Sequence, residues 1–572
     1  MHQLSAYLFS KERNEMMKLN QPGVTKRTRW TPPVPQSQQA HPDQVKNNAG
    51  GFTFTLTPEK QLERFLVLGS TAGTYYVGKN RLTVDNLKNI ASLLVSPGVS
   101  KQAVIDKAVQ YSVEGRVISN DTCLAALAMV SAYGDSSTKA RLPEALNQVA
   151  RTGTDILHFT SFANDLRGWG RSLKKLVAQW YTNKTPDAVA FQAGVKYKSR
   201  DGWSQRDVLR VCHPKSNDVV MTNVFKYITK GEHIDTYLPP IIMAAEKVKA
   251  NPTEKMAVDL ILNSNLPREA VPTELLNSTV VWEALAQKSP PHALIRNLAK
   301  MTSINVLKPL GDTTAMVVRK LSDVEALKRA RVHPMAILIA LRTYQKGMGD
   351  KGSLVWKPVP EIVAALEAAF FNSFGNVIPS GKKIMMGLDI SGSMGNSFIG
   401  STNMTAREAS FYMALVTAKI EPVTYTVAFD SKTHSSGIKG LMSASNGVRS
   451  VNLTGATNLG DYDRVCGKWS GGRTDCALPM LHAFEQALDV DCFVIYTDNE
   501  TWCGQIHPHV ALEQYNNKFR TPNGKPKAKL IVVGMTATNF TIAKPGDPDM
   551  LDVVGFDTNV PTLITNFAKG YF

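Results

Sequence analysis

The 572-residue sequence predicts an α + α/β fold, in which a solenoid of stacked helix pairs precedes a doubly wound α/β domain. Apolar residues recur at three- and four-residue spacing through most of the first two-thirds, which predicts amphipathic helices. In the last third, apolar runs of strand length alternate with helical segments, which predicts a parallel sheet covered on both faces. The pattern changes near Phe374, so we place the boundary between the two parts there.

The net charge is distributed unevenly along the chain. The sequence carries 65 Lys and Arg against 48 Asp and Glu, a formal charge of +17. From Gly381 to the end we count 17 residues of each sign, so the whole excess lies in residues 1–380. We therefore expect the first part to bind any polyanion, such as a nucleic acid, although many basic proteins bind none.

The composition excludes several classes of protein. Hydrophobic residues make up 43% and charged residues 20%, which is typical of a folded globular chain. No apolar run reaches the roughly 18–20 residues of a membrane span, and the start of the chain lacks a signal-peptide core. Six cysteines without a C-x-x-C pair indicate reduced thiols in the cytoplasm. The sequence shows neither a nucleophile elbow nor a catalytic carboxylate pair, so we do not predict an enzyme.

The chain before residue 376 divides into a tail and a helical region. Residues 1–48 predict a flexible N-terminal tail, because Pro32–Pro35 and the glutamines after them offer little apolar surface to bury. Residues 49–375 predict helices of 10 to 18 residues, for example over Asp121–Tyr133. No consensus recurs at a fixed period, so any repeats are degenerate.

Residues 376–572 alternate between strand and helix patterns. Strands are predicted at Ile384–Leu388, Val423–Phe429, Cys492–Tyr496, Leu530–Val533 and Asp552–Phe556. Helices are predicted at Met404–Lys419, Ala477–Leu488 and Thr562–Ala568. Sheets of this kind bind ligands at the carboxyl ends of their strands.

Three polar segments fall at those strand ends, namely Asp389–Ser393, Gly471–Asp475 and Thr497–Glu500. Their hydroxyls and carboxylates, including those of Thr474 and Asp498, are ligands that suit Mg²⁺, which tolerates partial hydration in octahedral geometry. A lone D-x-S-x-S segment also fits a tight turn with a capping serine. The three segments together predict a divalent-cation site.

These segments, in this order, resemble the von Willebrand factor A domain with its metal-ion-dependent adhesion site. The resemblance covers about residues 380–572, and no ligand position departs from the family pattern. It implies five ligands, which are Asp389, Ser391, Ser393, Thr474 and Asp498. In that family the site usually binds a protein carboxylate and performs no chemistry.

The excess charge is concentrated in residues 161–215, which hold eleven Lys and Arg against four Asp and Glu. The segment Leu166–Tyr181 predicts one amphipathic helix with Arg167, Arg171 and either Lys174 or Lys175 in a basic row beside the apolar face. Such a row suits phosphate groups, but it also fits an ordinary solvated face. The tryptophans of this segment are interpreted as core residues.

A second resemblance extends over most of the chain, to the TROVE domain and the A domain of the Ro 60 kDa autoantigen family. The matching segments are Gly73–Tyr76, Arg167–Arg171, Lys196–Lys198, Asp201–Ser204, Lys226–Gly231, Leu294–Leu298, His333–Ala340, Gly472–Cys476 and Thr497–Trp502. Their shared order runs from about residue 50 to the C-terminus.

This resemblance implies a ring of HEAT-like helical repeats closed by the A domain. It implies that Y RNA-like small RNAs bind a basic outer surface and that single-stranded 3′ ends of misfolded noncoding RNAs enter a central hole. The matching positions on the RNA-binding surface are Lys196, Arg200 and His213, to which Arg171 is a less direct addition. The role would be RNA quality control or the tethering of an exoribonuclease. The alternative is a metal-dependent protein-adhesion scaffold that binds no RNA.

Overall fold

The computed structural model describes residues 33–68, 91, 94, 99–117, 119–231, 237–349, 353–374, 377–399, 404–431, 447–453, 459, 471–519, 524, 528–557 and 559–571. Within this part of the chain, residues before 376 are mostly helical and those after 376 alternate between strands and helices. The predicted fold class is therefore confirmed. No helix among these residues has the length and apolarity that crossing a membrane requires.

The helices before residue 376 follow one another in a curved path, which we call the helical arc. Its longer helices are α2 (Pro58–Leu68), α4 (Lys101–Glu114), α5 (Asp121–Tyr133), α7 (Leu142–Val149), α8 (Gly153–Arg167), α9 (Arg171–Thr182), α11 (Gln205–Cys212), α12 (Val219–Lys230), α13 (Pro240–Ala250), α14 (Glu254–Ser264), α15 (Thr279–Lys288), α16 (Pro291–Ser303), α17 (Asp312–Ser322), α19 (Pro334–Lys346) and α20 (Pro360–Asn372). Shorter elements are α6 (Ser136–Ala140), α10 (Pro186–Val189), α18 (Val324–Arg329), the π-helix η1 (Ala190–Lys196), and the 3₁₀ turns η3 (Arg268–Ala270) and η4 (Thr273–Asn277).

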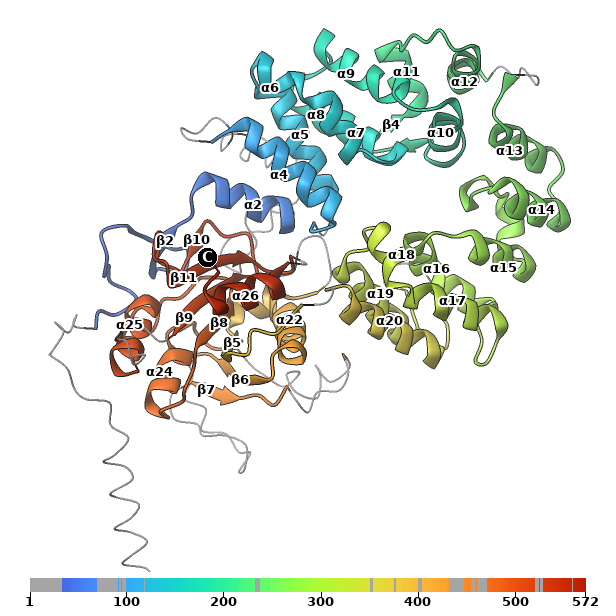
Figure 1. The fold of residues 1–572 in the computed structure, drawn as a ribbon. Coiled ribbons are helices and arrows are strands. Elements are labelled where there is room, and N and C mark those ends of the chain that lie inside the picture. The colour runs from blue at the N-terminus through green and yellow to red at the C-terminus, as the bar shows by residue number, and fades with distance from the viewer. Residues whose placement is uncertain are drawn as a thin grey trace, which may run out of the picture.

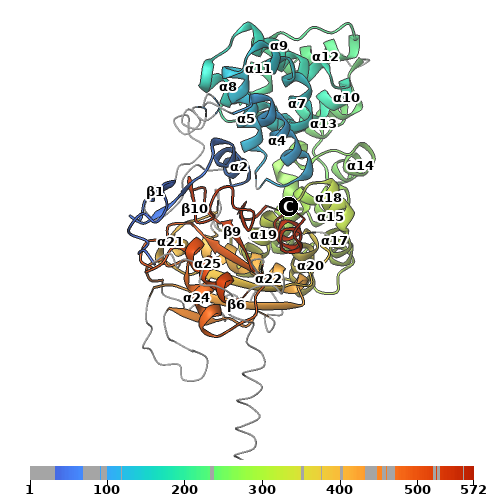
Figure 2. The same cartoon turned by 60° about the vertical axis from the view of Figure 1, so that its left-hand side comes forward.

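Each helix of the arc packs mainly against helices that are near it in the sequence, such as α4 against α5 and α19 against α20. This pattern is that of a solenoid, in which neighbouring units bury one continuous core. The arc starts at α2 beside the sheet domain and returns to that domain at α20 (Figures 1 and 2). The chain thus forms a ring in which the sheet domain joins the two ends of the arc.

The sheet domain, which we call the A domain, is built on six strands in the order β11-β9-β8-β5-β6-β7. The strands are β5 (Lys383–Asp389), β6 (Val423–Phe429), β7 (Val448–Ser450), β8 (Cys492–Thr497), β9 (Lys529–Gly534) and β11 (Met550–Val554). All neighbours pair in parallel except β7, which runs antiparallel at one edge. Its helices are α21 (Gly392–Asn396), α22 (Ala406–Ile420), α24 (Leu478–Glu485), α25 (Pro508–Lys518) and α26 (Val560–Lys569).

Successive side chains of each central strand point to opposite faces of this sheet and are buried there, as the two-residue period of a strand requires. Ile384 and Met386 join the core that includes α22, α26 and the arc, whereas Met385 joins a second core with α24 and α25. Gly387 faces this second core, and a methyl group on it would come within 2.7 Å of Pro479 in α24. Glycine at this position therefore allows α24 to lie directly on the strand.

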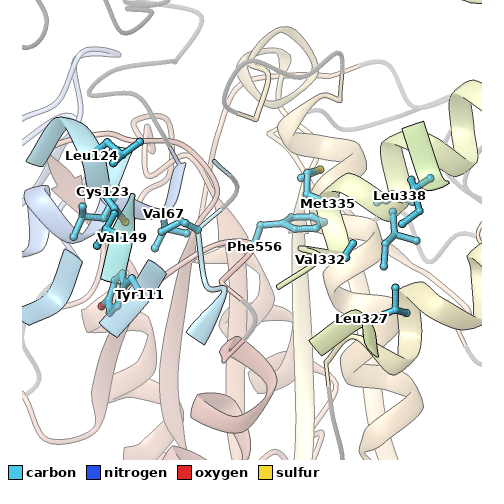
Figure 3. Close-up of a cluster of buried hydrophobic side chains, with 14 of the residues drawn as sticks. Val67, Tyr111, Cys123, Leu124, Val149, Leu327, Val332, Met335, Leu338 and Phe556 are labelled. Atoms are coloured by element: carbon cyan, nitrogen blue, oxygen red, sulfur yellow. The ribbon is translucent and has the colours of Figure 1, made fainter. Parts of the chain in front are cut away.

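The two ends of the arc meet the A domain at a buried contact that we call the closure seam. The Phe556 ring lies between Val67 and Tyr111, from the first helices, and Met335, from the last ones (Figure 3). Phe556 is fully buried and adopts a positive φ of 65°. A large residue held in this uncommon conformation is stable only when its surroundings fix it on all sides.

Buried ion pairs flank the closure seam. Arg116, just after α4, donates to both carboxylate oxygens of Asp557 at 2.5 to 3.1 Å. Arg64 of α2 donates to Asp552 of β11 at 2.7 Å and also to the Thr538 and Phe540 carbonyls. Because the Arg64 side chain is 1% exposed and that of Arg116 11%, loss of one partner would leave an uncompensated charge with little access to water.

The structure corrects the predicted extent of the tail, because residues 33–48 pack on the A domain. Strand β1 (Gln44–Lys46) pairs with β2 (Phe52–Thr55), which in turn pairs with β10 (Phe540–Thr541). The Gln36 side chain is fully buried and hydrogen bonds to Asp475, Thr501 and the Ile506 carbonyl. A polar segment is thus held by long-range hydrogen bonds, which composition does not reveal. Residues 1–32 of the predicted tail lie outside the described residues.

Gln36→Ala should lower the stability of the A domain by roughly 2–4 kcal/mol, because the carboxyl of Asp475 and the hydroxyl of Thr501 would lose a buried partner. Urea unfolding followed by circular dichroism measures this change. Gln38→Ala is the matched control, since the Gln38 side chain is exposed. Equal stability of the two variants would show that residues 33–48 do not contribute to the folded domain.

Candidate metal site and basic surface

The three polar loops meet at the carboxyl edge of the sheet, between β5 and β8. The chain leaves β5 toward β6 on one side, while β8 lies on the other side, so this is the switch point of the sheet. Asp389 ends β5, Thr474 precedes α24, and Asp498 follows β8. All five predicted ligands are brought together there, and each of their residues is at most 3% exposed.

Hydrogen bonds fix the first and third loops against each other. The Oδ1 atom of Asp389 accepts from the Ser391 amide at 2.9 Å, and its Oδ2 atom accepts from the Thr497 hydroxyl at 2.7 Å. The hydroxyl oxygens of Ser391 and Ser393 are 3.1 Å apart. The Oδ1 atom of Asp498 accepts from the Glu500 amide, whereas its buried Oδ2 atom has no hydrogen-bond partner among the described residues.

The electrostatics of the loops fit a bound cation. Burial, together with the repulsion from Asp498, raises the pKa of Asp389, and burial likewise raises the pKa of Asp498. A cation between them would replace this repulsion with attraction and give the Asp498 Oδ2 atom a partner. Two carboxylates and three hydroxyls are hard oxygen ligands, so the donor set fits Mg²⁺ with some water retained.

Close backbone packing holds the first and second loops together. A methyl group on Gly471 would lie 2.6 Å from the Gly392 amide and 2.7 Å from the Ile390 carbonyl, so only glycine permits this approach. Arg407 of α22 donates to the carbonyls of Ile390 and Ser391, both at 2.9 Å. The loop that carries the two predicted serine ligands is therefore positioned from both sides.

The N-terminal segment holds the third loop. Asn48 and the Ala49 amide donate to the two carboxylate oxygens of the buried Glu500, at 2.7 and 3.1 Å. Asn47 donates to the Thr501 carbonyl at 2.8 Å. A side chain on Gly51 would overlap the same carbonyl, so glycine is required there. This contribution to the site could not be foreseen from the sequence.

The basic region differs from its prediction in one important respect. The predicted helix over Leu166–Tyr181 is wrong, because α8 ends at Arg167 and α9 begins at Arg171. Gly168 has a φ of 77° and caps α8, and this conformation favours glycine. Arg167 is therefore not in a helical row with Arg171. It is exposed at the end of α8 and donates to the Ala132 carbonyl at 2.9 Å.

The tryptophans of this region belong to the core or its edge. Trp180 is 1% exposed and donates to the Ala150 carbonyl at 2.7 Å, as the core interpretation predicts. Trp169 is half-buried and packs edge-on against Trp203, with ring centroids 5.6 Å apart. Neither ring lies on an open face where bases could stack freely.

A short hairpin carries part of the basic surface. Strands β3 (Ser199–Arg200) and β4 (Trp203–Ser204) are joined by Asp201 and Gly202, which both have positive φ angles. Asp-Gly at the two central positions is typical of a type I′ turn. His158 of α8 pairs with the Asp201 carboxylate and so anchors the turn. Arg200 projects from this hairpin and is 59% exposed at its side chain.

Lys196 lies just before the hairpin, at the end of η1. Its ammonium group lies 5.0 Å from the centre of the Tyr197 ring and 5.4 Å from that of Phe191. These aromatic rings support the lysine stem and position its charge. Lys196 and Arg200 thus form one basic group near the start of α11.

The other predicted residues gather near the end of α11. Helix α9 runs alongside α11, with Tyr181 donating to Gln205 at 2.5 Å. Lys174 of α9 lies close enough to Cys212 to oppose the effect of burial, which raises the pKa of this thiol to about 12. Exposed His213 follows directly. Since α11 has eight residues, the two basic groups are about 12 Å apart.

The structure adds basic residues that the prediction did not include. Burial and the neighbouring Arg167 lower the pKa of Lys139, which places these two cations together. Burial and Lys249 lower the pKa of Lys198. Lys198 belongs to a recognised motif, but nothing in the sequence connects Lys139 or Lys249 with this surface. The basic surface, as we use the term, comprises Lys139, Arg167, Arg171, Lys174, Lys196, Lys198, Arg200, His213 and Lys249.

Comparison with known proteins assigns each of the two parts of the chain to a domain family. Residues 45–257 and 260–343 match the model of the TROVE domain, and residues 383–568 match that of the Ro60 vWA domain. The chain is 39% identical to the RNA-binding protein RO60 of Deinococcus radiodurans over 544 residues, covering 94% of this chain and 97% of that protein. The chain belongs to the Ro60 family.

A second relative and a solved structure support the same family for this chain. It is 33% identical to the RNA-binding protein RO60 of Caenorhabditis elegans over 612 residues, covering 94% of this chain and 91% of that one. The crystal structure of the Ro (Rsr) protein of D. radiodurans superposes with a TM-score of 0.64 at 37% identity, over 90% of this chain and 100% of that one. The TROVE match begins at residue 45, before the predicted boundary at 49.

Asp389→Asn tests the cation site. Mg²⁺ should raise the melting temperature of the wild-type protein and have no effect on the variant, because one charged ligand is lost. In EDTA the variant should be at least as stable as the wild type, since the substitution removes the repulsion with Asp498. Glu513→Ala, at an exposed position of α25, is the control. An unchanged Mg²⁺ effect in Asp389→Asn would exclude Asp389 as a ligand.

Proposed function

We propose that this chain is an RNA-binding protein that holds small structured noncoding RNAs, of the Y RNA type, on the basic surface. The observation that supports this most directly is the exposure of Arg171, Lys174, Arg200 and His213 on neighbouring helices and a hairpin, away from the metal site. Two relatives that align over nearly the whole chain carry the name RNA-binding protein.

The arrangement of charge suits a phosphate backbone. The basic groups at the two ends of α11 are about 12 Å apart, and a backbone with a phosphate every few ångströms can contact both at once. The contacts would come from long, exposed side chains, and such contacts position a structured RNA without reading its sequence. The partner class we propose is therefore small, folded RNA.

The ring suggests a second role on the same molecule. We propose that single-stranded 3′ ends of misfolded noncoding RNAs enter the space enclosed by the arc, while the folded part stays outside. The protein would then act in RNA quality control, in the cytoplasm, or would tether a nuclease through the bound RNA. No catalytic role is assigned to it. The Mg²⁺ site would hold the three loops of the A domain in place.

A protein-adhesion role through the metal site is the competing function. It is supported by the buried Asp498 Oδ2 atom, which a cation would engage. A partner carboxylate would have to reach the cation, yet every ligand residue is at most 3% exposed. Because the loops would have to open first, the RNA-binding function has stronger support.

The double variant Lys196→Ala/Arg200→Ala tests the RNA proposal. We expect its affinity for a Y RNA-like hairpin to fall at least about tenfold at 100 mM salt, because two phosphate contacts are lost. The slope of log affinity against log salt should become shallower by roughly 1.5. Fluorescence anisotropy at several salt concentrations measures both quantities.

Lys255→Ala/Arg319→Ala is the matched control, since it removes the same charge from exposed positions on α14 and α17. This control should retain wild-type affinity and slope. Thermal melting checks that each variant is folded. If both double variants lose affinity equally, the RNA is held by net charge alone and the assigned surface is wrong.

A further inference from the structure

Three arginines from separate parts of the arc gather beside the end of α4. Arg151 follows α7, Arg296 lies in α16, and Arg331 follows α18. Arg151 comes from the first part of the arc, whereas Arg296 and Arg331 come from its last part, and Figures 1 and 2 show the chain order of these elements around the ring. None of the recognised motifs or the basic surface includes Arg151 or Arg331.

Hydrogen bonds to α4 bring two of these arginines together. The Nη1 atom of Arg151 donates to the Ser112 hydroxyl at 2.7 Å, and the Nε atom of Arg331 donates to the Val113 carbonyl at 2.6 Å. Ser112 and Val113 are adjacent, so their Cα atoms are about 3.8 Å apart. The two side chains are thus held at neighbouring positions of α4, and Arg151 also donates to the Gln148 carbonyl at 3.1 Å. Each guanidinium group has further N–H donors beyond these bonds.

Arg296 joins them through His292, which lies one turn earlier in α16. The Nε2 atom of His292 contacts the Ala330 carbonyl at 2.9 Å, and this fixes α16 beside Arg331. Burial, Arg296 and Arg151 together lower the pKa of His292, as expected if both arginines lie near its ring. Burial and Arg331 lower the pKa of Arg151.

The arginines of this cluster have no direct carboxylate partner among the described residues, and only Arg151 has a buried carboxylate, that of Asp155, near enough to attract it. The single carboxylate of Asp155, which also accepts from the Thr152 amide in a capping box, faces a cluster that carries three positive charges. Arg331 also has a positive φ of 53°, an uncommon conformation for arginine that is often found at functional sites.

We propose that Arg151, Arg296 and Arg331 form a binding site for a phosphoryl group. Guanidinium groups present paired N–H donors that match tetrahedral oxyanions, and three of them surround more than one oxygen. The bound group would link α7 and α4 at the start of the arc to α16 and α18 at its end. An anion at this site therefore stabilises the closed ring.

The effect of inorganic phosphate on thermal melting, at ionic strength matched with NaCl, tests the site. Phosphate should raise the wild-type melting temperature by roughly 2–4 °C more than chloride does. In Arg296→Gln the dissociation constant obtained from these shifts should rise about tenfold, because one charge-assisted contact is lost. Arg296 projects from α16 and is exposed, so this variant should keep the wild-type melting temperature in chloride.

Arg319→Gln removes the same charge from an exposed position on α17 and should respond to phosphate as the wild type does. Arg151→Gln should weaken phosphate binding as Arg296→Gln does. Equal phosphate effects in Arg296→Gln and Arg319→Gln would overturn the proposal, because they would show general salt stabilisation. Since this assay contains no RNA, such a failure would leave the RNA-binding proposal intact.

Two short single-stranded RNAs, identical except for a terminal phosphate, identify the source of the phosphoryl group. If Arg296→Gln weakens only the phosphorylated RNA, the site binds an RNA end. If each RNA has the same affinity for Arg296→Gln as for the wild type, while inorganic phosphate binds Arg296→Gln more weakly than the wild type, the site binds free phosphate. Either result supports the site, provided that the melting experiment shows the loss in Arg296→Gln.

Discussion

The closure seam is the contact on which the ring depends. A solenoid has two open ends, and each would expose apolar surface unless something covered it. Here the A domain covers both, with Phe556 between the first and last helices and with Arg64 and Arg116 paired to its carboxylates. The position of every helix relative to the A domain follows from this contact. The N-terminal segment adds a second attachment through Gln36 and β1.

The ring separates three kinds of site. The three polar loops lie at the switch point of the sheet, the basic surface lies on elements from α6 to α13, and the arginine cluster lies beside the end of α4. The predicted metal ligands are buried, so a cation there would act mainly on the A domain itself. The basic surface consists of exposed side chains on rigid elements, which suits contact with a large polyanion. The arginine cluster connects ligand binding to closure of the ring.

Much of this architecture is visible in the sequence, and the rest depends on contacts between distant segments. The strand Val423–Phe429 was predicted with its observed bounds, because a buried strand leaves a continuous apolar run. The meeting of the three polar loops was predicted because parallel strands bring their carboxyl ends to one edge, whereas the bound cation stays a prediction. Burial of Gln36 was not predicted, since its partners are more than 400 residues away. The break at Gly168 was missed because apolar residues on either side of it continue the helical spacing.

Photocrosslinking of a bound small RNA, followed by identification of the crosslinked peptides, tests the central claim most directly. The account predicts that most crosslinks of the folded part of the RNA fall within residues 161–215, on the segment that carries seven excess positive charges. Few should fall on the A domain, whose sequence after Gly381 has no net charge. Crosslinks concentrated in residues 383–568 would contradict the assignment of RNA binding to the helical arc.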